Sequence, residues 1–482
     1  MKQSDYMPAP IAKVQANTFE NFGISRTDDY FWLKEKGDPE VIDYLRAENA
    51  YTDSVMKSTE ELQAQIYDEI IGRIKEDDES YPYFEDGYYY YVRTAKGKQY
   101  AEYLRKKGSL DAEEEVLFDV NKMAEGQSAF IFGGFTISPD NRLAAYLYNK
   151  TGSYAEFDMK IKNLETGEDL DFHLSGVASF AFANDSETVF YSKINAALRS
   201  DKVYRQKISD AEAILIYEEK DETFSSYVSS DKLKKFIYID SSSATTGEER
   251  YVSADRPEEE FQVFLPREHR VEYAITPHTD CFFIRYKDDE NLNGKVYRAP
   301  FGTYTDRSTW EEVIPHDENV TIESFILFED YLVSTVRENG LKYIKIMSLK
   351  PGDAYASETL RFPEAVYSVG LGANPQFKTT KVRYSYNSLK RPATLYEYDI
   401  VTKKTEVLKV QEIPSGFDSE LYEVERIFVE AKDGVKVPMA VLYKKGMQKD
   451  GSNPTLLYAY GSYGISTNPG FNTAVFSLVD RG

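Results

Sequence analysis

A tyrosine- and glycine-rich turn near the C-terminus carries the residues best suited to chemistry. The segment Leu456–Ser466 reads LLYAYGSYGIS, and its apolar start predicts a buried strand that runs into a turn. Tyr460 stands at the end of this strand, where a rigidly held phenol can donate a hydrogen bond to a developing oxyanion. The chain has 39 tyrosines, so simple packing is the ordinary alternative for Tyr460.

Ser462 lies in a pattern similar to the G-x-S-x-G nucleophile elbow, but it does not meet the requirement of that motif. The elbow needs glycine two residues before the serine, because the chain there turns too tightly for a Cβ atom. Tyr460 occupies that position. We therefore interpret Ser462 as a turn residue.

The histidines offer no base for a Ser-His-Asp triad, which needs a histidine between the serine and an orienting carboxylate. All four precede Tyr460 by more than a hundred positions and are interpreted as surface or structural residues: His173, His269, His278 and His316. Their spacing also lacks the H-x-x-x-H or Cys/His pattern of zinc sites. We expect no metal and no cofactor.

Composition narrows the class of protein further. The formal charge of −23 disfavours binding to nucleic acid, while an acidic surface either keeps the chain in solution or mildly attracts cationic peptides. The single cysteine, Cys281, reads as a buried strand residue and cannot form an internal disulfide. Neither a signal peptide nor an 18-residue apolar run is evident, so we expect a soluble, cytoplasmic protein with no membrane partner.

The N-terminal part is predicted to be helical. Asp38 and Pro39 form a plausible N-cap and first helical residue. Apolar residues then recur at helical spacing as far as residue 74, which predicts two amphipathic helices with a break around 57–59.

Short aromatic or β-branched strands dominate from about residue 80. A turn followed by an apolar strand recurs about every 50 residues, at Asp86, Asp140, Asp185, Asp231, Asp280, Asp330 and, in a degenerate copy, Thr379. Such a period is typical of a β-propeller, in which each blade is a small sheet. The pattern predicts a mainly β fold with seven four-stranded blades over residues 78–412, whereas a β-sandwich is the alternative.

A different organisation is predicted after residue 412. Residues 422–445 predict a β-hairpin that turns at 432–434, the strand TLLYAY follows, and residues 472–482 predict a short helix packed on that strand. We expect residues 1–77 and 413–482 to form the beginning of one α/β-hydrolase domain into which the propeller is inserted. That sheet is left incomplete at Gly482.

Several stretches make the chain similar to the prolyl oligopeptidase family of serine peptidases, in its oligopeptidase B branch. They are RTDDYFWLKE at 26–35, PEVIDYLRAENAY at 39–51, LIYEEKDETFSSYVSSDKLKKFIYI at 215–239, and the region from AKDGVKVPMAVLYKKG to YAYGSYG at 431–464. Collinear matches of this length are more specific than any single motif.

The resemblance implies a cytosolic serine oligopeptidase that cleaves short peptides after Arg or Lys, with the propeller limiting access to the active site. It assigns Tyr460 to the oxyanion hole and Tyr463 to the aromatic wall of the first specificity pocket, where packing stays open as an alternative. In that family the serine, aspartate and histidine of the triad follow Tyr460, so we expect them to be absent from this chain and the chain alone to be inactive. The segment Ser466–Gly470 lacks the acidic residues that help some members bind a second basic side chain. The rival interpretation is a non-catalytic propeller that binds a ligand.

Overall fold

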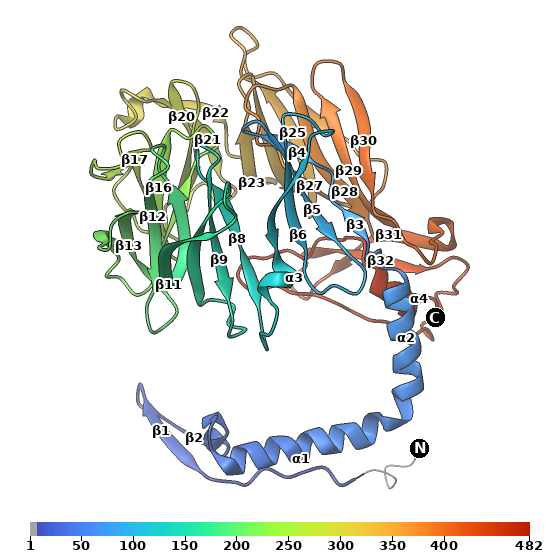
Figure 1. Ribbon diagram of the computed structural model, residues 1–482. Helices are drawn as coiled ribbons and strands as arrows, with labels where there is room; N and C mark the ends of the chain where they lie inside the picture. Colours follow the sequence, from blue (N-terminus) through green and yellow to red (C-terminus); the bar gives the residue numbers. More distant parts are fainter. Residues whose placement is uncertain (1–6) are drawn as a thin grey trace. The chain divides into compact units, whose positions relative to one another are not determined.

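The computed structural model describes residues 7–482, which divide into two compact units. The first unit contains the chain up to Ile74, Ile413–Gly416 and Thr473–Arg481. The second unit contains Lys75–Glu412, Phe417–Asn472 and Gly482. Figure 1 labels the elements of both units. The predicted domain limits at 77/78 and 412/413 stay predictions.

Two helices dominate the first unit, as the sequence predicts. Its elements are β1 (Asn17–Asn21), β2 (Ile24–Asp28), η2 (Phe31–Lys34), α1 (Pro39–Met56), η3 (Lys57–Thr59), α2 (Glu60–Gly72), η6 (Thr473–Val475) and α4 (Phe476–Val479). The Asp38 side chain caps α1 by accepting a hydrogen bond from Glu40 N at 2.8 Å, and Pro39 opens the helix. The short η3 turn separates α1 from α2, which confirms the predicted break at 57–59.

The helix α4 packs against α2, and the predicted short helix near the C-terminus is confirmed. Arg73 at the end of α2 donates to Ser477 Oγ at 2.6 Å, and Arg481 pairs with Glu69 at 2.7 Å. These contacts join segments that lie far apart in the sequence. No helix among residues 7–482 has the length and apolar character needed to cross a bilayer.

The second unit is built almost entirely of antiparallel strands. Its first sheet contains β3 (Asp78–Glu79), β4 (Tyr83–Glu85), β5 (Tyr88–Thr94), β6 (Glu102–Lys107) and β7 (Glu114–Asp119), and the short helix α3 (Val120–Met123) follows. The next sheet contains β8 (Ile131–Ile137), β9 (Leu143–Asn149), β10 (Phe157–Asn163), β11 (Asp169–Phe182), β12 (Thr188–Ile194), β13 (Ser200–Lys207) and β14 (Ile214–Glu218).

Four sheets of four strands complete the repeat region. The first two contain β15 (Ser225–Ser230), β16 (Phe236–Ser242), β17 (Gly247–Ser253) and β18 (Gln262–Val263), then β19 (Glu272–Pro277), β20 (Cys281–Lys287), β21 (Lys295–Pro300) and β22 (Glu311–Ile314). The last two contain β23 (Val320–Leu327), β24 (Tyr331–Glu338), β25 (Leu341–Ser348) and β26 (Ser357–Leu360), then β27 (Ser368–Leu371), β28 (Lys381–Ser388), β29 (Arg391–Asp399) and β30 (Lys404–Val410). The 3-10 turn η4 (Arg307–Thr309) precedes β22, and η5 (Ser419–Leu421) follows the repeats.

The prediction of a mainly β propeller is confirmed, but the prediction of seven separate four-stranded blades is wrong. Within the described chain, Lys75–Glu412 form five separate blades of four or five strands and one continuous seven-stranded sheet. The physical reason is β11, which runs for 14 residues without a break. Its first part pairs with β10 and its last part with β12, so the repeats marked by Asp140 and Asp185 share one sheet.

The recurring aspartates have a local structural role. The turn at Asp231 is an example: its carboxylate accepts hydrogen bonds from the backbone N–H groups of Leu233 at 2.8 Å and Phe236 at 2.8 Å. Asp185 similarly accepts from Thr188 N at 2.8 Å. An aspartate in this position satisfies turn amides that no strand partner reaches. This explains the aspartates of these two turns.

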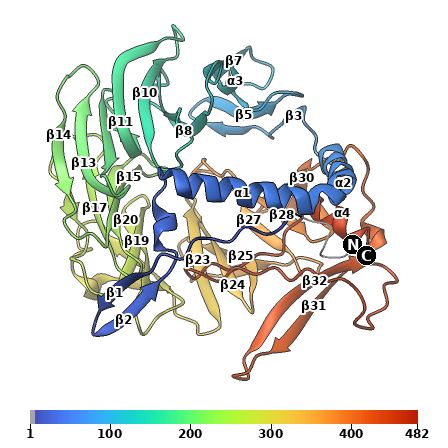
Figure 2. The same ribbon diagram turned by 90° about the horizontal axis from the view of Figure 1, so that it is seen from below.

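Neighbouring sheets of the repeat region pack face to face in a ring, which is visible from below in Figure 2. One apolar cluster, for example, joins Phe190 and Val203 of the seven-stranded sheet to Ile237 of the next sheet. The last sheet also reaches the first. Lys409 pairs with Asp78 at 2.7 Å, and Arg383 donates to the carbonyl oxygen of Pro82 at 2.7 Å.

The predicted hairpin after the repeats is confirmed, whereas the predicted strand TLLYAY is wrong. β31 (Tyr422–Glu430) and β32 (Lys436–Lys444) pair with each other across the turn at 432–434. Residues 455–460 have no regular secondary structure, and no described strand pairs with them. A buried strand needs partners for its N–H and C=O groups, so an apolar sequence alone does not form one. Residues 7–482 therefore do not show the α/β sheet expected here.

Candidate functional site

The two tyrosines that the sequence indicates lie in one exposed loop of the second unit. Tyr460 is 53% exposed and Tyr463 is 93% exposed. Tyr463 has a φ of 56° and Gly464 a φ of 69°, and the Ile465 N–H donates to the Ser462 carbonyl oxygen at 3.1 Å. Ser462 is thus a turn residue, as predicted. The roles of Tyr460 and Tyr463 stay predictions.

The far end of this loop is attached to two strands of the repeat region. Arg337 at the end of β24 donates to Asn468 Oδ1 at 3.0 Å. The Phe471 N–H donates to Asn387 Oδ1 on β28 at 2.9 Å. Arg337 is itself held by Glu323 at 2.6 Å, so its guanidinium has a fixed direction. The loop is therefore anchored after residue 467, while Tyr460 and Tyr463 precede the anchor.

The histidine contacts agree with structural roles. His173 Nε2 lies 3.3 Å from Asp158 Oδ2 on the neighbouring strand, and both side chains are partly exposed. His278 contacts Thr279 and two backbone carbonyl oxygens. Among residues 7–482, no hydrogen bond joins a histidine ring to a serine hydroxyl. A nucleophile activated by histidine is not assembled in this part of the chain.

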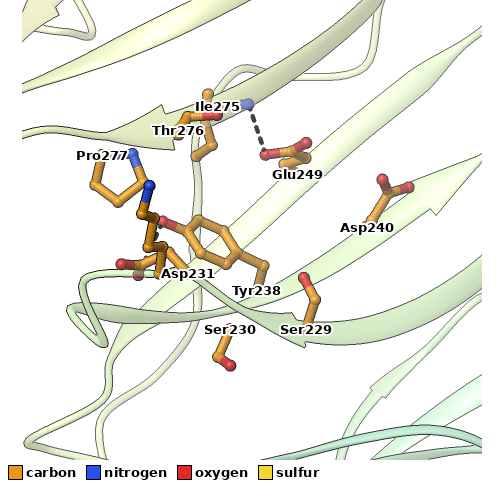
Figure 3. Close-up of a pocket in the computed structure, with 10 residues that line it drawn as sticks. Ser229, Ser230, Asp231, Tyr238, Asp240, Glu249, Ile275, Thr276 and Pro277 are labelled. Atoms are coloured by element: carbon orange, nitrogen blue, oxygen red, sulfur yellow. Dashed lines mark hydrogen bonds between the residues drawn. The ribbon is translucent and has the colours of Figure 1, made fainter. Parts of the chain in front are cut away.

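A cavity of about 210 Å³ lies between β15–β17 and β19 (Figure 3). Its walls come from two neighbouring sheets, and its lining residues are Ser229, Ser230, Asp231, Lys232, Tyr238, Asp240, Glu249, Ile275, Thr276 and Pro277. The strands place polar side chains here because alternate residues of a strand point to the same face. The cavity therefore combines three carboxyl groups with hydroxyl groups from serine and tyrosine.

Burial changes the protonation of these carboxyl groups. Glu249 is 7% exposed, and its Oε2 accepts one hydrogen bond from Ile275 N at 3.1 Å. Burial raises the pKa of Glu249 well above its usual range, and the nearby charge of Asp240 adds to this shift. Burial likewise raises the pKa of Asp240 and of Asp231. In the described residues no Lys or Arg forms an ion pair with these three carboxyl groups.

Lys232 is directed elsewhere although it lies in the wall. Its Nζ donates to the Leu327 carbonyl oxygen at 3.0 Å and lies 4.4 Å from the centre of the Phe328 ring. Burial lowers the pKa of Lys232 to about 8. The cavity can accordingly hold protons and donate or accept hydrogen bonds, but it contains no activated nucleophile.

Sequence reasoning did not single out Asp240 or Glu249. Each is an acidic residue inside an otherwise strand-forming segment, FIYIDSS for Asp240 and GEERYVS for Glu249. That local anomaly is the signal that could have identified them. The two residues are paired across the β16–β17 hairpin, whereas the cavity around them depends on the packing of β17 against β19, which no local pattern encodes.

Comparison with known families gives a match over most of the chain. Residues 9–411 match the family described as "Prolyl oligopeptidase, N-terminal beta-propeller domain". The matched range includes the N-terminal helices as well as every sheet of the repeat region.

Individual relatives extend the match beyond that range. The chain is 36% identical over 497 residues to dipeptidyl aminopeptidase BI of Pseudoxanthomonas mexicana, covering 98% of this chain and 68% of that protein. It is 31% identical over 486 residues to protease 2 of Moraxella lacunata, covering 99% of this chain and 69% of that protein. The structure of oligopeptidase B from Trypanosoma brucei with covalently bound antipain aligns with a TM-score of 0.91 and 29% identity, covering 98% of this chain and 70% of that one. The family resemblance expected from the sequence is confirmed.

Proposed function

We propose a peptidase function from the premise that this chain belongs to the prolyl oligopeptidase family. The chain supplies the propeller portion of such a peptidase. The observation that carries the proposal is the collinear match of nearly the whole chain to peptidases at 36% and 31% identity. A match of this length extends well beyond the general propeller architecture, which also occurs in non-enzymes.

The substrates that we propose are short peptides cleaved after Arg or Lys. Support comes from the likeness to oligopeptidase B structures of Trypanosoma brucei and Leishmania major, at 29% and 28% identity. The formal charge of −23 is compatible with cationic peptides, because an acidic surface raises their local concentration. In this proposal the propeller limits access, so that folded proteins are excluded.

For catalysis we assign Tyr460 to the oxyanion hole and Tyr463 to the first specificity pocket. The serine, aspartate and histidine of the triad are not among residues 1–482 in this proposal. That assignment is supported by the absence of any hydrogen bond between a histidine ring and a serine hydroxyl in residues 7–482. An oxyanion donor without a nucleophile and a base adds little hydrolysis by itself. A cytoplasmic location is also proposed, supported by the single, buried, free cysteine.

A second candidate function is removal of dipeptides from a free N-terminus. It is favoured by the 36% identity to a protein named dipeptidyl aminopeptidase BI. The two functions differ in one chemical requirement. A dipeptidyl aminopeptidase must recognise the α-ammonium group of its substrate, whereas an oligopeptidase accepts a blocked N-terminus.

Two fluorogenic substrates distinguish the candidates in the full-length enzyme: an N-blocked arginyl amide and the amide of a dipeptide that has a free N-terminus and arginine as its second residue. We expect hydrolysis of the blocked substrate, similar rates for Lys in place of Arg, and roughly 100-fold lower kcat/KM for Ala. Hydrolysis of the unblocked substrate alone would support the dipeptidyl aminopeptidase. If a serine-directed inhibitor blocks hydrolysis of neither substrate, the alternative of a non-catalytic propeller that binds a ligand is favoured.

A further inference from the structure

Three side chains that commonly bind transition metals meet at the turn between β19 and β20. One ligand atom each from His278, Asp280 and Cys281 lies within 4.8 Å of the other two. Cys281 is buried, His278 is half-buried and Asp280 is exposed. The cluster therefore has a sulfur atom at its base and an opening to solvent beside the carboxylate.

The His278 ring is oriented by contacts outside the cluster. Its Nε2 lies 3.2 Å from the Phe328 carbonyl oxygen and 3.1 Å from the Glu329 carbonyl oxygen. Carbonyl oxygens only accept hydrogen bonds, so Nε2 carries the proton and Nδ1 keeps its lone pair. Histidines that bind metals through one nitrogen typically donate from the other in this way. Nδ1 is thus the nitrogen that can bind a metal, in place of the hydrogen bond that it accepts from the Thr279 hydroxyl at 3.1 Å.

Further contacts hold the turn in place. The Lys235 ammonium donates to the carbonyl oxygens of His278 at 2.8 Å and Thr279 at 2.6 Å. The rings of Phe283 and Phe377 pack edge-on against the imidazole, with centroids 5.7 Å and 5.1 Å away. The backbone and the imidazole of the cluster are therefore fixed before any ligand binds.

One cation competes for the same ligands. The Arg298 Nε donates to Cys281 Sγ at 3.3 Å, and its Nη2 lies 3.6 Å from Asp280 Oδ1. The same guanidinium also has an alternative partner, because its Nη1 lies 3.6 Å from Glu311 Oε2. Arg298 can therefore turn toward Glu311 when another cation occupies the cluster.

We propose that His278 Nδ1, the Asp280 carboxylate and the Cys281 thiolate bind a zinc ion, with water as the fourth ligand. A thiolate with an imidazole and one carboxylate favours Zn²⁺ over the oxygen-preferring Mg²⁺ and Ca²⁺. Ligand atoms around tetrahedral zinc lie roughly 3.3 to 3.8 Å apart, so shifts of about 1 Å complete the geometry. On binding, the thiol releases one proton to solvent and the sulfur forms the metal bond. The site is independent of the proposed peptidase chemistry.

Cobalt absorption tests the thiolate ligand directly, since Cys281 is the single cysteine of the chain. Titrating the purified, reduced chain with Co²⁺ should produce thiolate-to-cobalt charge-transfer absorption that one equivalent of Zn²⁺ abolishes. Cys281→Ser should remove this absorption, and His278→Gln should weaken Co²⁺ binding at least about tenfold. His316→Gln is the matched control and should bind like the wild type.

The Arg298 variant gives the sharpest test because its expected effect has the opposite sign. Arg298→Gln removes the competing positive charge and should tighten the Co²⁺ dissociation constant about tenfold. Zn²⁺ should also raise the thermal midpoint of the wild type but not that of Cys281→Ser or His278→Gln. If Cys281→Ser does not fold, the half-buried His278→Gln and the Arg298 variant still decide the question. Absence of charge-transfer absorption in the wild type, or metal binding and stabilisation unchanged by these substitutions, would overturn the proposal.

Discussion

The repeat region and the segment from residue 422 to 470 belong to one compact unit, yet they differ in the solvent exposure of their apolar side chains. Phe282 and Phe328 in the repeat region are 1% and 0% exposed. Leu457 and Tyr458 in the later segment are 77% and 74% exposed. The repeats place each strand beside partners from the same chain, and neighbouring sheets cover each other. Residues 455–460 have equally apolar sequence but no strand to pair with.

Whether an apolar side chain is buried therefore depends on the segments that can pack against it as well as on its own sequence. Ile427, Phe428 and Val437 of the β31–β32 hairpin are also 39%, 52% and 41% exposed. An exposed apolar sheet face gains little from the hydrophobic effect until something covers it. The repeat region should therefore control stability, whereas the later segment should affect activity more than folding.

The largest expected effect on stability comes from Phe282→Ala. The ring of Phe282 packs against Phe301 and Phe264 with centroids 4.7 Å and 5.2 Å away. Truncation should lower the free energy of unfolding by about 3 to 5 kcal/mol, because it leaves a cavity among aromatic rings. Chemical denaturation followed by tyrosine fluorescence measures the change. Leu457→Ala is the control, with an expected change within about 0.5 kcal/mol; equal losses in both variants would erase the contrast between the regions.

Tyr460→Phe tests whether the later segment contributes to catalysis. In the full-length enzyme, loss of the hydroxyl should lower kcat roughly 10² to 10³-fold, equivalent to about 2.7 to 4 kcal/mol, with little change in KM. The thermal midpoint should stay the same because the side chain is 53% exposed. Unchanged kcat on a blocked arginyl substrate would remove Tyr460 from the mechanism.

Glu249→Gln should stabilise the protein at neutral pH. Burial raises the pKa of Glu249 well above its usual value of 4.5, so folding must take up a proton or bury a charge when the unfolded glutamate is ionised. Wild-type stability from this group is fully present below pH 4.5 and is lost as pH rises through the folded pKa. The thermal midpoint of the variant should therefore exceed that of the wild type at pH 7, and the two should converge near pH 4.5. The exposed Glu290→Gln serves as the control; an unchanged or lower midpoint for Glu249→Gln at pH 7 would contradict the burial argument.

A smaller pH effect of opposite sign is expected in the first unit. Hydrogen bonds from Arg481 lower the pKa of Glu69 from 4.5 to about 2. The stabilisation is therefore present above pH 4.5 and is lost as pH falls toward about 2. Glu69→Gln should lower the thermal midpoint slightly at pH 7 and not at pH 2. Arg481→Gln should reproduce this loss, and a double variant with additive losses would argue against the pair.

Local sequence patterns predicted most of the elements. Asp38 and Pro39 marked the start of α1, and the aspartate-containing turns marked the strands that follow them. These features depend on hydrogen bonds within a few residues, so the sequence specifies them. The number of sheets depended on whether β11 would break near Gly176. It continues through that residue and pairs with both β10 and β12, and the turn signals alone did not indicate this.

The candidate site was less predictable for the same reason. Asp240 and Glu249 face each other across the β16–β17 hairpin, but the cavity that they line is closed by β19 of the next sheet. His278 is oriented by carbonyl oxygens about 50 residues away in the sequence. Tyr460 was identified from a family resemblance, which carries information that spacing alone does not. Its surroundings in residues 7–482 leave its role as a prediction.

An assay of peptide hydrolysis by the purified 482-residue chain tests most directly our proposal that this chain lacks the catalytic triad. The chain should release no fluorophore from a blocked arginyl amide above the buffer rate, because in our proposal it lacks the triad, and no histidine contacts a serine hydroxyl in residues 7–482. The full-length enzyme, measured in parallel, should hydrolyse the same substrate and lose activity to a serine-directed inhibitor. Inhibitor-sensitive turnover by the 482-residue chain alone would contradict the account.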